Sequence, residues 1–311
     1  MVKLLKPMLP SLVTEIPSGT DWVYEVKYDG FRAIVYLEEE KITIVSRNQN
    51  ILNEQFPEII EAFKMRVQDL PLPIILDGEL CVLDSPIRAN FEKIQKRGRL
   101  KSLEKIEQAK KVSPVTFLAF DLLMENGDYK TKMALIERKK QLKALLEQFG
   151  KQSFVDYVEH HEQPHRLWGD VLSEKGEGLI AKQKLSLWQE GRSKQWQKIK
   201  NMAIASFFVL AYDETNAFFH IGCIYQNEIK LIGKVGQGFT KEEKEALIAI
   251  IKKNRVKTEQ GLTYVKPSIC IEVEFLELSK NELRHPKFRR FRLDKKWEDC
   301  TWEAIPKTEL R

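Results

Sequence analysis

The sequence predicts an α+β protein of two domains, residues 1–201 and 202–311, and three observations support this. Stretches with the apolar and polar alternation of strands recur through the first two hundred residues, separated by segments of helical pattern. After Met202 the pattern changes to short strands around one helical segment, which suits a small Greek-key barrel. A length of 311 residues is comfortable for two domains. We therefore expect antiparallel sheets with flanking helices, followed by a small β-barrel.

Composition narrows the class of protein. Hydrophobic residues make up 43% and charged residues 31%, which is typical of an ordinary soluble protein and shows no bias toward disorder. The net charge of +6 suits a polyanionic partner. The apolar start is interrupted by Pro7 and Pro10, so it predicts neither a spanning helix nor a signal peptide, and we expect a cytoplasmic protein without membrane contact. The four cysteines form no CxxC pair, so neither structural zinc nor a disulfide is expected.

The first strong strand pattern is Trp22–Val26, in which Glu25 shares a face with the following Lys27. Asp29-Gly30 is a turn signal, and alternation resumes over Ala33–Leu37, so the two strands are expected to form a hairpin. Lys27 then lies near the end of a buried strand. Desolvation and cationic neighbours there would lower its pKa and make it a nucleophile. The alternative is a surface lysine whose stem packs along apolar groups.

Carboxylates and an arginine follow on the next elements. A strand over Lys41–Arg47 places Arg47 at the rim of a sheet, and a helix is expected over Phe56–Val67, opened by Pro57. The strand Pro73–Leu83 carries Asp77 and Glu79 on one face. Paired buried carboxylates need a cation or hydrogen-bond donors. The alternative is a bulge at Asp77-Gly78 with an exposed Glu79.

The remaining elements of the first domain alternate between basic and apolar character. Residues 88–100 form a basic loop and helix that could grip nucleic-acid phosphates or simply face solvent. Thr116–Leu123 is an apolar strand, in which Phe120 would by itself be a core residue. Ala134–Phe149 predicts an amphipathic scaffold helix. Lys198 and Lys200 share one face of a strand, which is costly unless an anion lies between them.

The second domain is predicted as a barrel of the OB type. Helical pattern covers Lys241–Lys253. Strands are expected over Ile204–Tyr212, Ala217–Tyr225, Glu228–Val235 and Ile271–Leu278. OB folds bind nucleic acids in many settings, so this domain alone does not separate an enzyme from a binding module.

Five stretches together resemble the covalent nucleotidyltransferases, the superfamily of DNA ligases, RNA ligases and mRNA capping enzymes. They are KYDGFR from Lys27, DGE from Asp77, the strand of Phe120, EGLIAK from Glu177 and WQKIK from Trp196, and they occur in the order of that superfamily. The resemblance implies a nucleotidyltransferase (adenylation) domain of antiparallel sheets with flanking helices, followed by an OB-fold β-barrel domain. It covers nearly the whole chain.

The resemblance also implies roles for individual residues. Lys27 would become linked to AMP, while Mg²⁺, with Mn²⁺ as the alternative, would be held through carboxylates. The implied roles are adenine recognition for Glu25, orientation of sugar or phosphate for Arg32 and Arg47, ribose and metal contact for Glu79, stacking on the purine for Phe120, metal contact for Glu177, contact with the second face of the base for Ile180, and a grip on the α-phosphate for Lys198 and Lys200.

The tail from Arg284 to Trp297 resembles the last element of the superfamily, which ends in RxDK in ligases of bacterial end joining. Arg292, Asp294 and Lys295 fit that ending. The resemblance implies that Asp294 and Lys295 reach the triphosphate when the second domain closes. Arg290 stands where glycine is more usual, which bears on the conformation of the segment.

Among the relatives, the sequence is most similar to the ATP-dependent ligase domain of LigD-type proteins. Twenty-six residues precede Lys27, too few for the extra domain with which NAD-dependent ligases recognise their cofactor, so ATP is expected. The implied activity is sealing of nicked double-stranded DNA in repair, with a Ku-type end-binding protein as a candidate partner and a monomeric chain. The alternatives are an RNA ligase, a capping-type guanylyltransferase, and a non-catalytic OB-fold nucleic-acid-binding protein.

Overall fold

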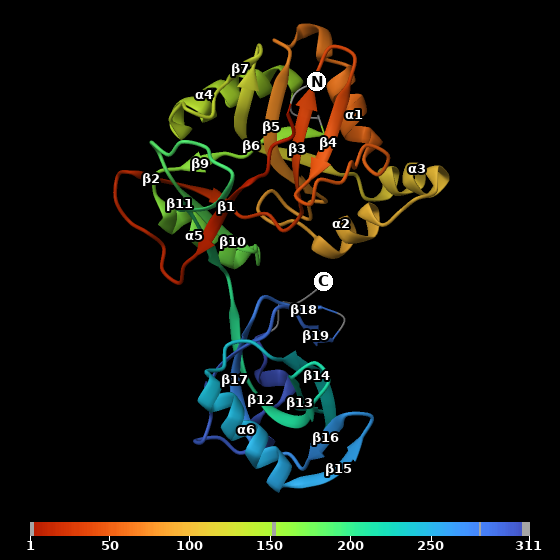
Figure 1. The fold of residues 1–311 in the computed structure, drawn as a ribbon, viewed down its shortest axis with the longest axis vertical. Coiled ribbons are helices and arrows are strands. Elements are labelled where there is room, and N and C mark those ends of the chain that lie inside the picture. Colours follow the sequence, from red (N-terminus) through yellow and green to blue (C-terminus); the bar gives the residue numbers. More distant parts are fainter. Residues whose placement is uncertain (1–2, 151–153, 280, 307–311) are drawn as a thin grey trace. The chain divides into compact units, whose positions relative to one another are not determined.

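The computed structural model describes residues 3–150, 154–279 and 281–306 and divides the chain into two compact units, Met1–Asn201 and Met202–Arg311 (Figure 1). Within these described ranges, no helix is long and apolar enough to cross a membrane. The α+β class predicted from the sequence is confirmed.

Unit 1 contains two sheets whose strands lie far apart in the sequence. One sheet has the strand order β1-β11-β10-β2-β9, and the other has the order β4-β3-β5-β6-β7 with β8 beside β6. Pairing is antiparallel except for β1 with β11 and β6 with β8, which are parallel. The elements of unit 1 are β1 (Met8–Leu12), β2 (Trp22–Val26), β3 (Phe31–Leu37), β4 (Ile42–Ser46), α1 (Pro57–Lys64), β5 (Ile74–Cys81), α2 (Phe91–Gly98), α3 (Leu103–Val112), β6 (Thr116–Glu125), β7 (Asp128–Tyr129), α4 (Leu135–Leu146), β8 (Val155–Tyr157), β9 (His160–His161), α5 (Pro164–Ser173), β10 (Gly178–Gln183) and β11 (Gly191–Lys200), with short 3₁₀ helices at Val67–Asp69 and Glu147–Phe149.

Alternate side chains of β3 point to opposite faces of its sheet and pack into two different hydrophobic cores. Ala33 and Val35 pack into a cluster with the apolar face of α1, whereas Ile34 and Tyr36 pack into a second cluster that includes Trp196 of the other sheet. Helix α1 therefore covers one face of the sheet, and the strands of the second sheet cover the other (Figure 1). The pocket described below lies between these two sheets.

The predicted hairpin of the first two strong strands is wrong. Strand β2 pairs with β10 and β9, while β3 pairs with β4 and β5, so the two belong to different sheets. The turn at Asp29-Gly30 carries the chain from one sheet to the other. A Cβ atom at Gly30 would lie 2.3 Å from the carbonyl oxygen of Leu80, so only glycine allows the chain to pass this close to β5.

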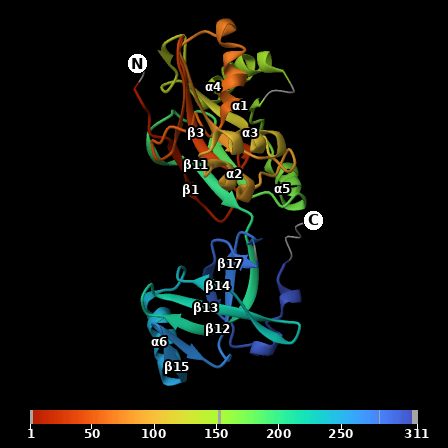
Figure 2. The ribbon, with the colours of Figure 1, turned by 90° about the vertical axis from the view of Figure 1, so that its right-hand side faces the viewer.

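Unit 2 is rich in strands, with α6 beside them (Figure 2). Leu247 and Ile251 of α6 belong to the apolar core of this unit. Its main sheet has the order β14-β13-β12-β16-β15, and β17 joins β12 to β20. Helix α6 has the predicted bounds, and its start is fixed by a capping box between Thr240 and Glu243. The elements of unit 2 are β12 (Ala203–Asp213), β13 (Phe218–Tyr225), β14 (Glu228–Val235), α6 (Lys241–Lys253), β15 (Arg255–Glu259), β16 (Leu262–Val265), β17 (Cys270–Phe275), β18 (Leu278–Ser279), β19 (Glu282–Leu283) and β20 (Lys287–Phe291), with 3₁₀ helices at Trp297–Asp299 and Trp302–Ala304.

Candidate functional site

A pocket between the two sheets of unit 1 gathers most of the residues singled out from the sequence. Its predicted members come from β2, β3, β5, β6, β10 and β11, from the residue that follows β2, and from the loop after β4. They are Glu25, Lys27, Arg32, Arg47, Glu79, Phe120, Ile180 and Lys198. Glu177 and Lys200 lie beside Lys27 and are described next. Asp294 and Lys295 belong to unit 2.

Lys27 follows the last residue of β2, and its backbone N–H donates to Gly178 O at 2.9 Å. Its Nζ pairs with Glu177, which in turn lies 3.5 Å from Lys200 Nζ. Burial acts to lower the pKa of Lys27, but the negative charges of Glu177, Glu79 and Asp29 outweigh it and raise the pKa. The expectation that the pKa of Lys27 is lowered is therefore wrong for this arrangement of charges, because the carboxylate of Glu177 pairs with the amine directly.

Lys198 and Lys200 lie on one face of β11, opposite Ile180 and Gly178 of β10. Burial lowers the pKa of Lys198, and the neighbouring charges of Lys27 and Lys200 add to the effect. The costly clustering of cations expected from the sequence is present, and of these two lysines only Lys200 forms an ion pair with a carboxylate in the described structure. An anion bound here would be stabilised by these lysines.

Glu79 supplies a carboxylate without a directly paired cation in the described residues, although Arg32 and Lys27 are near enough to influence it. Burial raises its pKa to about 8, and Glu177 and Asp29 act in the same direction. The register of β5 against β6 shifts between Asp77 and Gly78, but the residue that it skips is Phe120 on β6, and Glu79 lines the pocket. The alternative of a bulge at Asp77-Gly78 with an exposed Glu79 is therefore wrong, because Asp77 and Gly78 pair regularly with β3 and Glu79 is partly buried.

The carboxylates of Glu79 and Glu177 fit a divalent cation. Within the described ranges, no three His, Cys, Asp or Glu side chains form a metal cluster. Mg²⁺, however, is usually held by one or two carboxylates together with substrate phosphates. A carboxylate whose ionisation is disfavoured by burial, as at Glu79, would be stabilised by such a cation.

Arg32 is held rigidly at the pocket wall. Its Nε and Nη2 donate to the two oxygens of Asp77 at 2.6 and 2.7 Å, and Trp188 Nε1 donates to the same carboxylate at 3.3 Å. Asp77 is fully buried, so this bidentate pair accounts for one of the two carboxylates noted in the sequence. Arg47 lies just beyond β4 with an exposed side chain, at the predicted rim position.

The aromatic residues of the pocket lie close to cations. Phe120 is 8% exposed, and its ring has Arg32 Cζ 4.2 Å and Lys182 Nζ 4.4 Å from its centroid. Trp196 packs edge-on at 6.2 Å, and Lys182 Nζ also lies 4.2 Å from the Trp196 ring. Phe120 is therefore both a packed core residue and a wall of the pocket. Ile180 lines the pocket from β10.

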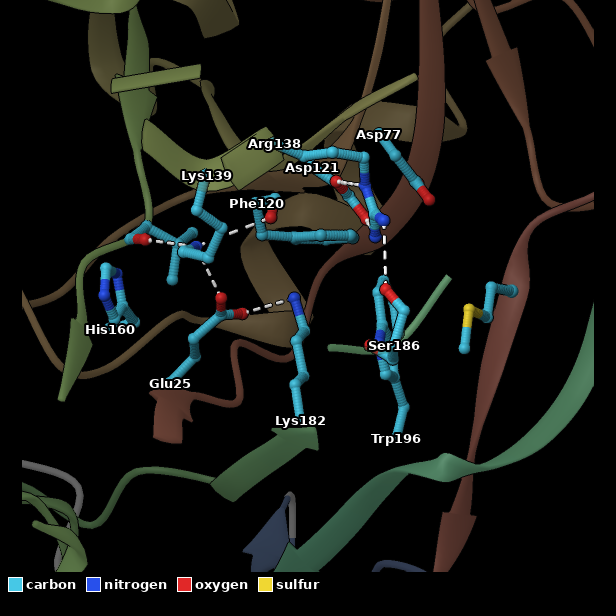
Figure 3. Close-up of polar contacts among 12 residues, drawn as sticks. Glu25, Asp77, Phe120, Asp121, Arg138, Lys139, His160, Lys182, Ser186 and Trp196 are labelled. Atoms are coloured by element: carbon cyan, nitrogen blue, oxygen red, sulfur yellow. Dashed lines mark hydrogen bonds and ion pairs between the residues drawn. The ribbon is translucent and has the colours of Figure 1, made fainter. Parts of the chain in front are cut away.

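Two functional candidates escaped the sequence analysis, Lys182 and Lys139. Both contact Glu25, with Lys139 Nζ 2.5 Å from Oε1 and Lys182 Nζ 2.6 Å from Oε2 (Figure 3). Burial alone would raise the pKa of Glu25, but the two lysines hold it below its ordinary value. Lys182 closes the EGLIAK stretch, and Lys139 lies at helical spacing from Leu135 and Leu142, so a charge on the apolar face of the predicted helix was the available signal.

Burial and the nearby charge of Lys139 together lower the pKa of Lys182 to about 8, although Glu25 opposes the shift. The folded chain therefore binds fewer protons than the unfolded chain between about pH 8 and the ordinary value of 10.5. Stability from this group should rise with pH across that window, by on the order of 3 kcal/mol. Chemical denaturation of the wild type and of Lys182→Met at several pH values measures it.

Because other groups also titrate in this range, the difference in unfolding free energy between wild type and Lys182→Met is the relevant quantity. The exposed Lys194 of β11 provides a matched control, and Lys194→Met should follow the wild type at every pH. A wild-type curve parallel to that of Lys182→Met would show that Lys182 keeps an ordinary pKa.

The predicted tail motif lies at the end of β20 and just beyond it. Arg292 donates to both oxygens of Asp294 at 2.8 and 2.6 Å, and this pairing holds the pKa of Asp294 below its ordinary range. Arg290 lies within β20 and pairs with Glu272 at 3.0 and 3.1 Å. Arg290, which stands where glycine is more usual, is thus an ordinary strand residue in this chain. The side chain of Lys295 is partly exposed.

The basic run of residues 88–100 does not act as one surface. Arg97 on α2 is 2% exposed and donates to Glu58 at 2.9 and 3.1 Å and to two backbone carbonyls. Arg97 is thus a structural residue, and the expectation that it grips phosphates is wrong. Lys96 and Arg99 remain at the surface.

Each of the two units matches a different family model of known proteins. Residues 7–200 match the family model described as ATP dependent DNA ligase domain, and residues 214–295 match the ATP dependent DNA ligase C terminal region. The chain is 35% identical over 96% of its length to the bifunctional non-homologous end joining protein LigD of Bacillus subtilis (strain 168), of which it covers 51%. It is 26% identical over 96% of its length to a DNA ligase of Thermococcus fumicolans, of which it covers 58%. The chain thus spans about half the length of these curated relatives.

Solved structures support the same fold. A structure of mycobacterial DNA ligase D complexed with ATP and MES is 24% identical, with a TM-score of 0.56, and the match covers 96% of this chain and 98% of that one. A structure of a Lig E DNA ligase is 19% identical, with a TM-score of 0.64 and coverage of 94% and 100%. The predicted fold, an adenylation domain followed by an OB-fold-like domain, is confirmed. Because the family models match most of both units, the chain belongs to the family of ATP-dependent DNA ligases.

Proposed function

We propose that this chain seals 5′-phosphate/3′-hydroxyl nicks in double-stranded DNA through a covalent lysyl-AMP intermediate on Lys27, using ATP. One observation carries the proposal: the amine of Lys27 lies in a pocket that also presents Lys198, two carboxylates and an aromatic wall. A nucleophile beside groups suited to a phosphate, a divalent cation and a base is what transfer of a nucleotide requires.

The reaction has three steps. Lys27 Nζ attacks the α-phosphorus of ATP, forming a P–N bond while the bond to the β-phosphate oxygen breaks and pyrophosphate leaves. The 5′-phosphate of the nick then attacks the AMP phosphorus, and the P–N bond breaks. The 3′-hydroxyl finally attacks the activated 5′-phosphate, and AMP leaves. The first step requires Lys27 to lose a proton, and Glu177 contacts its Nζ and is positioned to take it.

Mg²⁺, or Mn²⁺ in its place, would be held through Glu79 and Glu177 and would neutralise charge that develops on the phosphate oxygens. In the proposal Glu177 therefore has two tasks, since its carboxylate also sets the protonation of Lys27. Glu79 must be ionised for its part, against the effect of burial on its pKa.

The other pocket residues bind and orient the nucleotide. Glu25 and Lys182 line the pocket side by side. The carboxylate of Glu25 can accept a hydrogen bond and the amine of Lys182 can donate one, so we assign recognition of adenine to them. Lys182 Nζ pairs with Glu25 Oε2, and no other hydrogen-bond partner of this amine lies in the described part of the chain, which leaves an N–H group for a ring nitrogen of the base. The remaining proposed roles are packing against the base for Phe120 and Ile180, orientation of sugar or phosphate for Arg32 and Arg47, stabilisation of the α-phosphate for Lys198 and Lys200, and orientation of the β- and γ-phosphates for Asp294 and Lys295.

The test is incubation of the wild-type chain with ATP labelled at the α-phosphate, and separately with labelled GTP, followed by addition of a nicked duplex. Retention of AMP and its loss on sealing are expected. Label from GTP alone would identify a capping-type guanylyltransferase, and sealing confined to RNA would identify an RNA ligase. No covalent label from either nucleotide would refute the proposed function.

Glu177→Ala and Lys198→Ala are each expected to slow self-adenylation by roughly a hundredfold or more, the scale of losing one preorganised charge contact. ATP binding should weaken less, because several other groups hold the nucleotide. Rates of lysyl-AMP formation without DNA measure this. Lys194→Ala, an exposed lysine on the same strand as Lys198, should keep the wild-type rate. Near-normal rates in both test variants would make these residues purely structural.

The proposal extends to the cellular context: a monomeric chain that works in the bacterial cytoplasm on DNA breaks, with a Ku-type end-binding protein as partner. The resemblance to LigD-type proteins supports this, together with the name of the Bacillus subtilis relative. Joining of linear DNA should increase on addition of Ku, whereas sealing of a preformed nick should not. Elution of the chain at the mass of a dimer would contradict the monomer.

A further inference from the structure

Lys139 of helix α4 is buried behind the wall of the pocket, where it contacts Glu25. Lys139 has a fully buried side chain, and its Nζ reaches Glu25 Oε1 at 2.5 Å, Val158 O at 3.0 Å and Phe120 O at 3.4 Å (Figure 3). The three N–H donors of the ammonium group therefore have three acceptors. A lysine this deeply buried is rare unless it is paired.

The preceding residue anchors the helix. Arg138 Nε and Nη2 donate to the two carboxylate oxygens of Asp121 at 2.7 and 2.8 Å, and Nη1 donates to Ser186 O at 3.1 Å (Figure 3). This bidentate pair ties α4 to β6 and to the segment between β10 and β11. Lys139 is therefore presented from a fixed backbone and not from a mobile surface helix.

Glu25 connects this buried lysine to the pocket. Glu25 and Lys182 line the pocket, whereas Lys139 does not. One carboxylate oxygen of Glu25 faces Lys139 and the other faces Lys182. If Lys139 were absent, nothing else described here would hold the first oxygen, and the carboxylate could rotate toward Lys182. The direction of the acceptor on the pocket wall thus depends on Lys139.

We propose that Lys139 is a positioning residue that orients Glu25 and so sets selectivity for a 6-aminopurine nucleotide. The inference rests on the proposed function, in which Glu25 accepts from the 6-amino group of adenine. Lys139 itself touches no nucleotide. Its effect is to keep one carboxylate oxygen occupied, so that the remaining acceptor positions of Glu25 are directed at the base.

The test compares ATP with purine riboside triphosphate, which lacks the 6-amino group. Binding of each is measured by calorimetry, with Mg²⁺ present, to the Lys27→Ala chain, in which no transfer to residue 27 can follow. This chain should prefer ATP by about tenfold, the size of one hydrogen bond to a charged group. Adding Lys139→Met should reduce the preference to about twofold or less. Lys140→Met, an exposed lysine one position along α4, should leave it at tenfold.

A ratio of two dissociation constants on one preparation does not depend on the fraction of folded chain, so it separates positioning from stability. Equal weakening of both nucleotides by Lys139→Met would overturn the inference and make Lys139 a structural residue. If Lys139→Met does not fold, Lys139→Gln is measured by the same criterion, because its amide ends short of the position of Nζ.

The inference and the proposed function can fail separately. If the Lys27→Ala chain does not distinguish the two nucleotides, the 6-amino group is not recognised and the inference falls. Covalent labelling of the wild type by ATP would then still support the proposed function.

Discussion

Replacing Lys27 with alanine is expected to abolish both covalent labelling by ATP and sealing of an ordinary nick. The side chain supplies the only proposed nucleophile, and alanine leaves no amine to form the P–N bond. Intact-mass measurement after incubation with ATP and Mg²⁺ should show no added AMP. The free energy of unfolding should change by less than about 1 kcal/mol, because Lys200 remains 3.5 Å from Glu177 and keeps a cation beside that carboxylate.

The matched control is a nick that already carries AMP on its 5′-phosphate. The last step requires no amine at residue 27, so Lys27→Ala should still seal this substrate. Labelling of the alanine variant at the wild-type level would show that another residue is the nucleophile. Failure on the pre-adenylated nick as well would mean that Lys27 acts in binding DNA or in folding.

The second large effect concerns Lys295, and it follows from what each step must bind. Pyrophosphate leaves only in the first step, so a group that orients the β- and γ-phosphates should matter there and not afterwards. Lys295→Ala should therefore slow self-adenylation by about a hundredfold or more and leave sealing of a pre-adenylated nick within severalfold of wild type. Asp294, whose carboxylate is held by Arg292, provides the neighbouring negative charge.

Lys296 offers a matched control for this prediction. It is exposed and follows Lys295 directly in the chain, so Lys296→Ala removes the same charge from the neighbouring position. It should affect neither assay by more than severalfold. The measurement compares rates with ATP and nicked DNA against rates with the pre-adenylated nick and no ATP. Equal losses for Lys295→Ala in both assays would mean that the residue binds DNA throughout the reaction.

The local sequence pattern and the order of the short motifs were sufficient to predict much of the secondary structure and the family of this protein. The length of α6 follows from the helical pattern over Lys241–Lys253, and its start is fixed by the capping box between Thr240 and Glu243, which acts within one turn. The α+β class, the strand-rich second unit and the membership of a ligase family were likewise predicted from strand periods and from the order of five short stretches. The secondary structure depends on residues close together in the chain, and the family resemblance depends on short stretches and their order, so both can be read without knowing distances in space.

Tertiary structure decided what depends on residues far apart in the chain. Strands β2 and β3 look like a hairpin locally, but they pair with strands of different sheets, and Gly30 between them passes within contact of β5. Lys27 appeared set for a lowered pKa, yet Glu177, 150 residues away, raises it. Lys139 on α4 was assigned to a scaffold helix, although its partner is Glu25, 114 residues distant. A pKa and an ion pair depend on distances through space, and those distances are set only when the two sheets pack around the pocket.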